Sequence, residues 1–259
     1  MRNLLISVAA MAVMAAGVAA SSAATKEVPY PAVKVQLPDA YKPDAAFAKM
    51  QRSLADAAGK KDVQALLALV GPTFVWLSEG DISDQFDFGG DALQNFKVVF
   101  GFRNYRKQAD GGVSDGPYWD ALANFAADKI FEQSTDTLVC GPMVATVDDD
   151  VLDNARQKIG ADDSVEWYFT TANASVTATP AGGATVGHAD QLALPVLDVY
   201  PQAAQGQPEP PVTHLKVLLP SGKSGWIPVS AALPLVTDRL CYALMPNGDW
   251  KIAGFDQAQ

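Results

Sequence analysis

The sequence predicts an α+β domain at residues 25–160, followed by a small β-barrel at residues 164–259. Three observations lead to this fold class. In the first part, apolar residues recur at the spacing of amphipathic helices, with isolated strand-like runs between them. In the second part, short β-branched and aromatic runs alternate with Gly, Pro, Asn and Asp, which is typical of a small barrel or sandwich. An acidic stretch without clear periodicity, residues 148–163, lies between the two parts and marks the expected domain boundary.

Residues 1–24 are predicted to be a signal peptide. Met1-Arg2-Asn3 supplies a positive start, Leu4–Ala20 is an apolar run of 17 residues, and Ser22-Ala23-Ala24 offers small residues for cleavage. We expect cleavage after Ala24, with Ala20 and Ala23 as alternatives. The other interpretation is an uncleaved membrane anchor, although the run is rich in Ala and is at the lower length limit for spanning a bilayer. The sequence thus predicts a periplasmic or secreted protein without a stable membrane anchor.

The first part opens with an extended lead-in, because four prolines lie between residues 25 and 43. Asp44 is a suitable helix N-cap, and Phe47, Met50 and Leu54 then recur on one helical face. The same reasoning predicts helices at residues 45–58, 62–70, 91–102 and 117–128, and strands at residues 73–77 and 137–147.

The second part is predicted to contain strands and one flexible loop, at residues 202–211, which lacks apolar anchors. The strands are expected at residues 165–171, 174–179, 192–200, 213–219, 225–229, 240–244 and 250–255.

Parts of this second half resemble the bacterial SH3-like domain. The segments that carry the resemblance are Ala174–Pro180, Val186 with Leu192–Leu197 and, most strongly, Leu215–Ile227, which reads LKVLLPSGKSGWI. Thr177 and His214 stand where that family usually has Arg and Trp. The resemblance implies an SH3-like barrel, and the whole chain is similar to uncharacterised exported proteobacterial proteins that carry such a module. That group has no activity to transfer.

The candidate binding residues are Trp226, Tyr200 and His214. Trp226 enters a strand directly after a predicted turn at Ser221–Ser224, where Gly222 suits a positive φ. Two interpretations remain for its ring. It fills one end of the barrel, which we favour because a strand tryptophan is usually buried in part, or it lines an exposed groove for a sugar or a peptide.

The two cysteines, Cys140 and Cys241, are predicted to form a disulfide, because an exported protein folds in an oxidising compartment. The bond would close a loop of about 100 residues and would be worth up to ~4.7 kcal/mol in the chain-entropy model. With one cysteine in each predicted part, it would also clamp the two domains together. The alternative is two separate buried thiols.

Composition excludes several classes of partner and site. The chain carries 19 Lys and Arg against 29 Asp and Glu, a net charge of −10, which argues against a nucleic-acid partner. Two Cys and two His cannot supply a Cys₄ or Cys₂His₂ zinc site without carboxylates. Neither a Gly-x-Ser-x-Gly elbow nor a His-Glu-x-x-His motif occurs. We expect no metal and no cofactor, and we interpret His188 and His214 as turn and barrel-edge residues.

Clusters of charge in the loops are interpreted as solvated. The acidic clusters at residues 79–91 and 148–153 offer oxygen ligands for calcium, but counting from Asp81 puts Phe86 at the glycine position of an EF-hand loop. The one basic patch, residues 103–107, is interpreted as a helix end.

These observations predict a non-enzymatic exported binding or scaffold protein of the cell envelope that contacts peptidoglycan or an envelope protein. Two alternatives stay open. One is an envelope hydrolase with a site in the N-terminal domain or in the cleft between the domains. The other is a small-molecule-binding domain, because the helix–helix–strand order at residues 44–77 resembles nuclear-transport-factor-like cones.

Overall fold

The computed structural model describes residues 25–78, 91–102, 118–202 and 210–257. The predicted signal peptide, the acidic residues from Glu79 to Asp87 and the basic patch at residues 103–107 lie outside the described residues. Within those ranges, no helix is long and apolar enough to cross a membrane.

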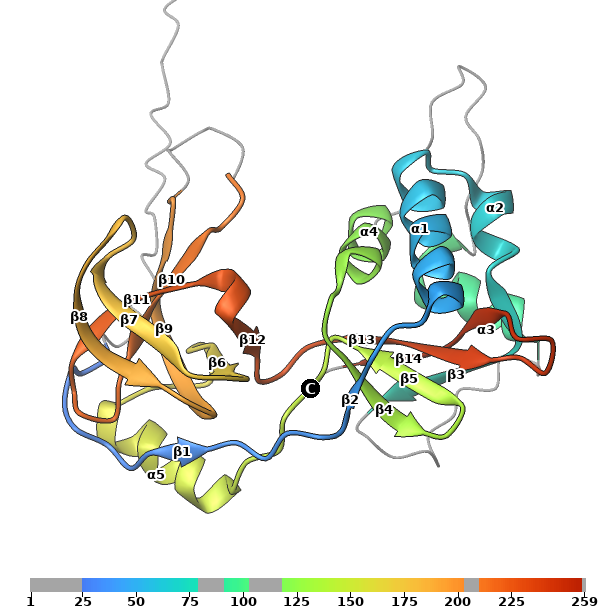
Figure 1. The fold of residues 1–259 in the computed structure, drawn as a ribbon. Helices are drawn as coiled ribbons and strands as arrows, with labels where there is room; N and C mark the ends of the chain where they lie inside the picture. The colour runs from blue at the N-terminus through green and yellow to red at the C-terminus, as the bar shows by residue number, and fades with distance from the viewer. Residues whose placement is uncertain (1–24, 79–90, 103–117, 203–209, 258–259) are drawn as a thin grey trace, which may run out of the picture.

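The described chain forms two lobes, each built on one β-sheet (Figure 1). We call the first the helical lobe; it consists of β2 (Ala40–Tyr41), α1 (Ala45–Gly59), α2 (Val63–Leu67), β3 (Val70–Ser78), α3 (Ala92–Val99), α4 (Trp119–Ala127), β4 (Phe131–Thr135), β5 (Leu138–Gly141), β13 (Arg239–Leu244) and β14 (Trp250–Gln257). We call the second the β-lobe; it consists of β1 (Val33–Lys34), α5 (Asp149–Ile159), β6 (Trp167–Thr170), β7 (Ala174–Thr179), β8 (Gly182–Ala189), β9 (Leu192–Tyr200), β10 (His214–Leu218), β11 (Ser224–Pro228), the 3₁₀ helix η3 (Val229–Ala231) and β12 (Ala232–Pro234).

The predicted fold class, an α+β domain followed by a small closed barrel, is wrong. The structure is mostly β, with 39% strand and 26% helix. The strands of the β-lobe follow the order β12-β6-β9-β10-β11-β7-β8, with β1 beside β9, and the described pairings do not join β8 to β12 into a barrel. The reason lies in the last two strands, β13 and β14, which pair outside this sheet.

The β-lobe is inserted into the helical lobe. The sheet of the helical lobe has the order β2-β4-β5-β13-β14-β3, so the chain leaves it after β5 and returns to it at β13. β14 then runs parallel to β3, whereas the other neighbours in this sheet are antiparallel. The residue ranges 25–160 and 164–259 therefore do not coincide with the two lobes.

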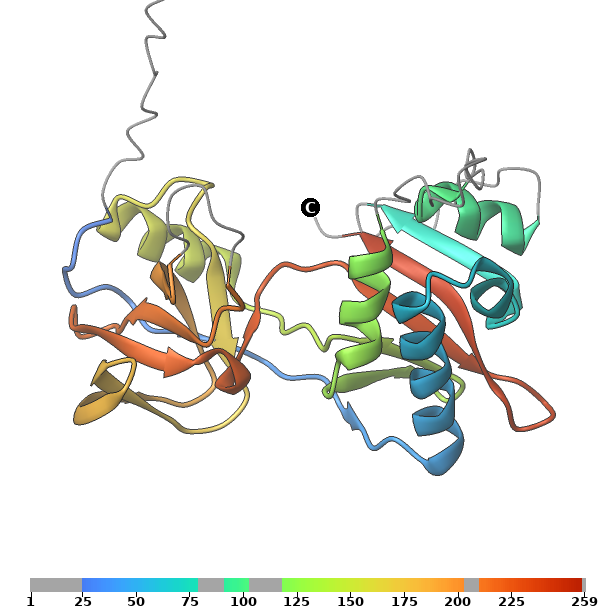
Figure 2. The same cartoon turned by 90° about the horizontal axis from the view of Figure 1, so that it is seen from above.

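Three segments of chain connect the lobes, between β1 and β2, between β5 and α5, and between β12 and β13 (Figures 1 and 2). The first two are hydrogen-bonded to each other. Gln36 N–H donates to the Thr146 carbonyl at 2.8 Å, and Thr146 N–H donates to the Gln36 carbonyl at 3.1 Å. This bridge ties two of the three connecting segments together.

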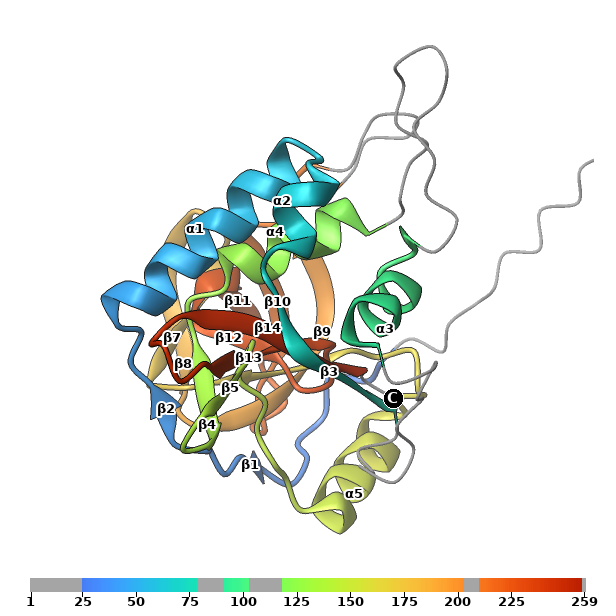
Figure 3. The ribbon, with the colours of Figure 1, turned by 90° about the vertical axis from the view of Figure 1, so that its right-hand side faces the viewer.

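The helical lobe buries an aromatic core between its helices and its sheet. Helices α1, α2 and α4 lie over one face of the sheet (Figure 3). Asp44 caps α1 by accepting a hydrogen bond from the Phe47 N–H at 2.7 Å, as its sequence position predicts. The ring of Phe47 then meets those of Phe131, Tyr242 and Trp250 at centroid distances of 4.9, 5.2 and 5.1 Å, in edge-on geometries that aromatic pairs prefer.

The acidic stretch at residues 148–163 is not an unpatterned boundary, because most of it forms helix α5. Asp148 caps the helix by accepting from the Val151 N–H at 3.1 Å, and Gly160 ends it in the left-handed conformation with φ 67°. Leu152, Ala155 and Ile159 are buried on one face. The acidic first turn and the basic last turn also match the helix dipole.

Candidate binding site

The structure brings the three predicted binding residues together on one face of the β-lobe. Tyr200 ends β9, His214 begins β10 and Trp226 lies in β11, on three neighbouring strands. The ring of Tyr200 lies near both other rings, with centroids 6.5 Å from His214 and 6.2 Å from Trp226. We call this group the aromatic face.

Trp226 is not the core residue that we favoured from the sequence. It is half-buried, whereas its neighbours Gly225 and Ile227 are buried. Successive side chains on a strand point to opposite faces of the sheet. Ile227 belongs to the core of the β-lobe, so Trp226 lies on the opposite, outer face.

Gly225 shows why this register is fixed. A Cβ atom there would lie 2.6 Å from Val186 Cγ2, 2.7 Å from Val176 Cγ1 and 2.8 Å from the Thr177 carbonyl oxygen. Glycine therefore allows β11 to lie close to β7, with Trp226 as the cross-strand neighbour of Thr177.

Threonine hydroxyls hold the backbone beside the three rings. The Thr177 hydroxyl lies 2.9 Å from the Thr179 carbonyl oxygen and 3.3 Å from that of Trp226. On the other side, the N–H and the hydroxyl of Thr213 donate to the Tyr200 carbonyl at 2.8 and 3.1 Å. The Thr213 hydroxyl also lies 3.0 Å from His214 Nδ1. Thr177 thus positions the backbone of Trp226.

Charged residues that we did not predict lie at the same surface. Lys216 is the cross-strand neighbour of both Asp198 and Trp226. Its ammonium group lies 3.8 Å from Glu27, whose carboxylate also accepts from the Ser224 hydroxyl at 2.9 Å. The alternation along β10 of polar His214 and Lys216 with apolar Leu215 and Val217 is the sequence signal that would have placed Lys216 on this face.

This arrangement is chemically suited to binding. Tyr200 exposes 49% of its surface, so a flat aromatic ring is available for stacking. The imidazole of His214, the ammonium of Lys216 and the carboxylate of Asp198 add hydrogen-bonding groups around it. Aromatic surface with a few convergent polar groups is typical of recognition sites.

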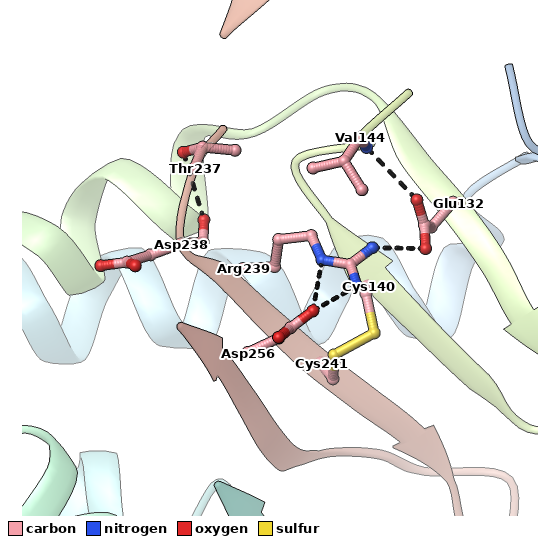
Figure 4. Close-up of polar contacts among 8 residues, drawn as sticks. All are labelled: Glu132, Cys140, Val144, Thr237, Asp238, Arg239, Cys241 and Asp256. Atoms are coloured by element: carbon pink, nitrogen blue, oxygen red, sulfur yellow. Dashed lines mark hydrogen bonds and ion pairs between the residues drawn. A yellow bond between two sulfur atoms is a disulfide. The ribbon is translucent and has the colours of Figure 1, made fainter. Parts of the chain in front are cut away.

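The predicted disulfide between Cys140 and Cys241 is confirmed by the structure, but the prediction that it clamps two domains is wrong. Both cysteines lie in the sheet of the helical lobe, directly opposite each other on β5 and β13, with a Cα–Cα distance of 4.1 Å (Figure 4). The chain returns to the helical lobe after β12, which the sequence did not indicate. The bond therefore closes a loop that contains α5 and every strand of the β-lobe except β1.

A largely buried ion cluster lies beside the disulfide (Figure 4). Arg239 pairs with Glu132 at 2.5 Å and, through two of its nitrogens, with Asp256. Burial alone would lower the pKa of Arg239, but the two carboxylates raise it above its usual value. Glu132 also accepts from the Val144 N–H at 3.2 Å, so the cluster connects β4, β13 and β14 to the segment that leads out toward the β-lobe.

The described residues of the aromatic face do not form a hydrolytic centre or a metal centre. His188 is exposed on β8, on the far side of β7 from the aromatic face. Among the described residues, no group of three or more His, Cys, Asp and Glu side chains is arranged to hold a metal ion.

The chain matches no protein-family model, no curated protein and no solved structure. The geometry of its own residues is therefore the basis for a functional proposal.

Proposed function

We propose that this protein is an exported, non-enzymatic binding protein of the bacterial cell envelope, and that the aromatic face contacts peptidoglycan. The observation that carries the proposal is the placement of Tyr200, His214 and Trp226 on the outer face of the β-lobe sheet rather than in its core. Export is expected from the sequence of residues 1–24.

The chemistry of the aromatic face supports a sugar as the direct contact. An exposed tyrosine ring and a half-buried tryptophan ring offer apolar surface to the C–H faces of a pyranose. The neighbouring His214, Lys216 and Asp198 can donate to or accept from ring hydroxyls. The net charge of −10 disfavours general adsorption to an anionic cell wall, so the contact is local and depends on these side chains.

Co-sedimentation of the purified protein with isolated peptidoglycan tests the proposal. Tyr200→Ala and Trp226→Ala are each expected to lower the pelleted fraction several-fold. Tyr118→Ala is the matched control, because Tyr118 is similarly exposed, at 40%, but begins the α4 region of the helical lobe. We expect this variant to pellet like the unmodified protein.

Three results would overturn the proposal. The first is no pelleting of the unmodified protein, which would favour an envelope protein as the partner. The second is pelleting that neither Tyr200→Ala nor Trp226→Ala changes. The third is an equal loss in Tyr118→Ala, which would show that exposed aromatic surface in general causes the pelleting.

A further inference from the structure

A cleft of about 740 Å³ lies between the two lobes. One wall consists of α4 and the residues that lead into β4, and the other consists of residues from β6, η3 and β12. Tyr168, Pro234 and Thr237 also line a second hollow of about 640 Å³, so the two hollows adjoin at β12. Volumes of this size accommodate a small organic molecule, and clefts between lobes are common ligand sites.

The walls of the cleft are mainly apolar. Phe125 and Ile130 contribute from the helical lobe, and Leu233 and Pro234 from the β-lobe. The ring of Tyr168 lines both the cleft and the second hollow. A ligand that fills this space therefore needs an apolar or aromatic body.

Asp128 is the most unusual polar group of the cleft. Its backbone carbonyl accepts from Gln51 Nε2 at 3.0 Å, which fixes the end of α4 against α1. Its carboxylate oxygen Oδ2 is buried and has no hydrogen-bond partner among the described residues. Burial raises the pKa of Asp128 to about 7. Asp128 also lines the cleft, so a cation bound there would lie close to its carboxylate and would favour its charged form.

The other charged groups around Asp128 also favour a cation. Among the described residues, Asp238 and Lys129 also line the cleft. The adjoining hollow carries Asp163, Glu166 and Arg156, and Arg156 lies 3.4 Å from the carboxylate of Asp153 in its own helix. In the part of the chain that the structure describes, carboxylates therefore outnumber basic groups along the two hollows.

We propose that the interlobe cleft binds a small organic cation, an amine with an apolar or aromatic body. The ammonium group pairs with the Asp128 carboxylate, and the body packs between Phe125 and the ring of Tyr168. Charge-assisted hydrogen bonds to a carboxylate are the stronger kind, and an aromatic ring attracts a nearby cation further. This site is distinct from the aromatic face, because the cleft uses the β12–β6 end of the sheet and the aromatic face spans β9 to β11.

Titration calorimetry of the full chain with three matched probes tests this inference. The probes are phenethylammonium, the neutral 2-phenylethanol and the anionic phenylacetate, which share an aromatic body and differ in charge. We expect the cation to bind about tenfold more tightly than the neutral probe, which corresponds to about 1.4 kcal/mol. We expect phenylacetate to bind most weakly.

Two variants and one control locate the binding. Asp128→Asn removes the charge, and Ser230→Trp places a large ring into the cleft from an exposed position of η3. Both are expected to lower the affinity for phenethylammonium about tenfold. Asp120→Asn changes a carboxylate in the first turn of the same helix and is expected to leave the affinity unchanged.

Equal affinity for the three probes would overturn the proposal. So would phenethylammonium binding that survives in either folded variant, or a loss of the same size in Asp120→Asn. Because Ser230 is exposed, its variant decides the question even if Asp128→Asn fails to fold. None of these results depends on peptidoglycan, so this inference and the proposed function can fail separately.

Discussion

Removing the disulfide between Cys140 and Cys241 tests how the helical lobe holds the inserted β-lobe. The bond joins residues 101 positions apart, and the chain-entropy model assigns a loop of this length ~4.7 kcal/mol. Both cysteines are buried, with 2% and 4% exposure. Replacement by Ala therefore leaves the site apolar, so most of the effect comes from the unfolded chain. For a chain of this size, such a loss lowers Tm by on the order of 10–20 °C.

The assay is thermal and urea denaturation of Cys140→Ala, Cys241→Ala and the double variant, followed by circular dichroism. The double variant should lose little more than either single one, because the two changes break the same bond. Unfolded but unreduced protein should show no free thiol with Ellman's reagent, and reduction should release both.

The place of the bond gives a second readout. Both cysteines lie on neighbouring strands of the helical lobe, so amide hydrogen exchange should accelerate in β5 and β13 more than in β10 and β11. A loss of stability below about 1 kcal/mol would contradict the loop-closure reasoning. Faster exchange confined to β10 and β11 would contradict the assignment of the bond to the helical lobe.

Two further predictions concern Gly225 and Asp128. Gly225→Ala should lower the free energy of unfolding by about 1–3 kcal/mol, because the new methyl group meets the Thr177 carbonyl of the neighbouring backbone. Gly59→Ala is the control: it has open space and lies in helix α1, where alanine is favoured over glycine, so it should not lower the urea midpoint. Equal losses in the two variants would show that the contact with Thr177 is not the cause. Because burial raises the pKa of Asp128 from 3.8 to about 7, its stabilising contribution is complete below pH 3.8 and is lost as the pH rises through 7, by up to about 1.4 kcal/mol per pH unit. Urea midpoints between pH 5 and pH 8 should show this decline in the unmodified protein and a smaller one in Asp128→Asn, and equal slopes would refute the assignment to Asp128.

The local elements were largely predictable, because their signals lie within a few residues of one another. Asp44 and the spacing of Phe47, Met50 and Leu54 predicted α1, and the helix spans Ala45–Gly59. The β-branched and apolar runs predicted β7 and β9 with the bounds that the structure has. In such segments the spacing of the apolar residues and the identity of the cap residues indicate the same secondary-structure element.

Among the elements that the sequence did not predict, β8 and α5 were missed for different reasons. β8 spans Gly182–Ala189, where three glycines weaken the strand signal. It forms because it pairs with β7, for example at Ser175 with His188. Helix α5 has a cap at Asp148 and an apolar stripe, but the dense charges around this stripe favoured the interpretation as a solvated loop. The high share of charge reflects a helix that buries one narrow face.

The larger errors concern connections between distant segments. Nothing in the composition of β13 and β14 distinguishes them from the strands of the β-lobe, since all are short and apolar. The partner of β13, strand β5, lies about a hundred residues earlier, and β14 pairs with β3, which lies earlier still. Sheet membership depends on these long-range pairings, which residue patterns do not encode. Because these pairings were not predicted, the disulfide bond was predicted correctly but its role as an interdomain clamp was wrong.

The topology of the insertion separates the two proposed binding surfaces. β12 ends the sheet of the β-lobe and faces the helical lobe across the cleft, whereas β9, β10 and β11 lie further along the same sheet. The base of the insertion is held by the disulfide, by the Arg239 cluster and by the hydrogen-bonded pair Gln36 and Thr146. These ties keep the β12 edge beside α4, whereas β9, β10 and β11 lie further from that edge. The proposed cleft site and the proposed peptidoglycan contact therefore use different parts of the same sheet.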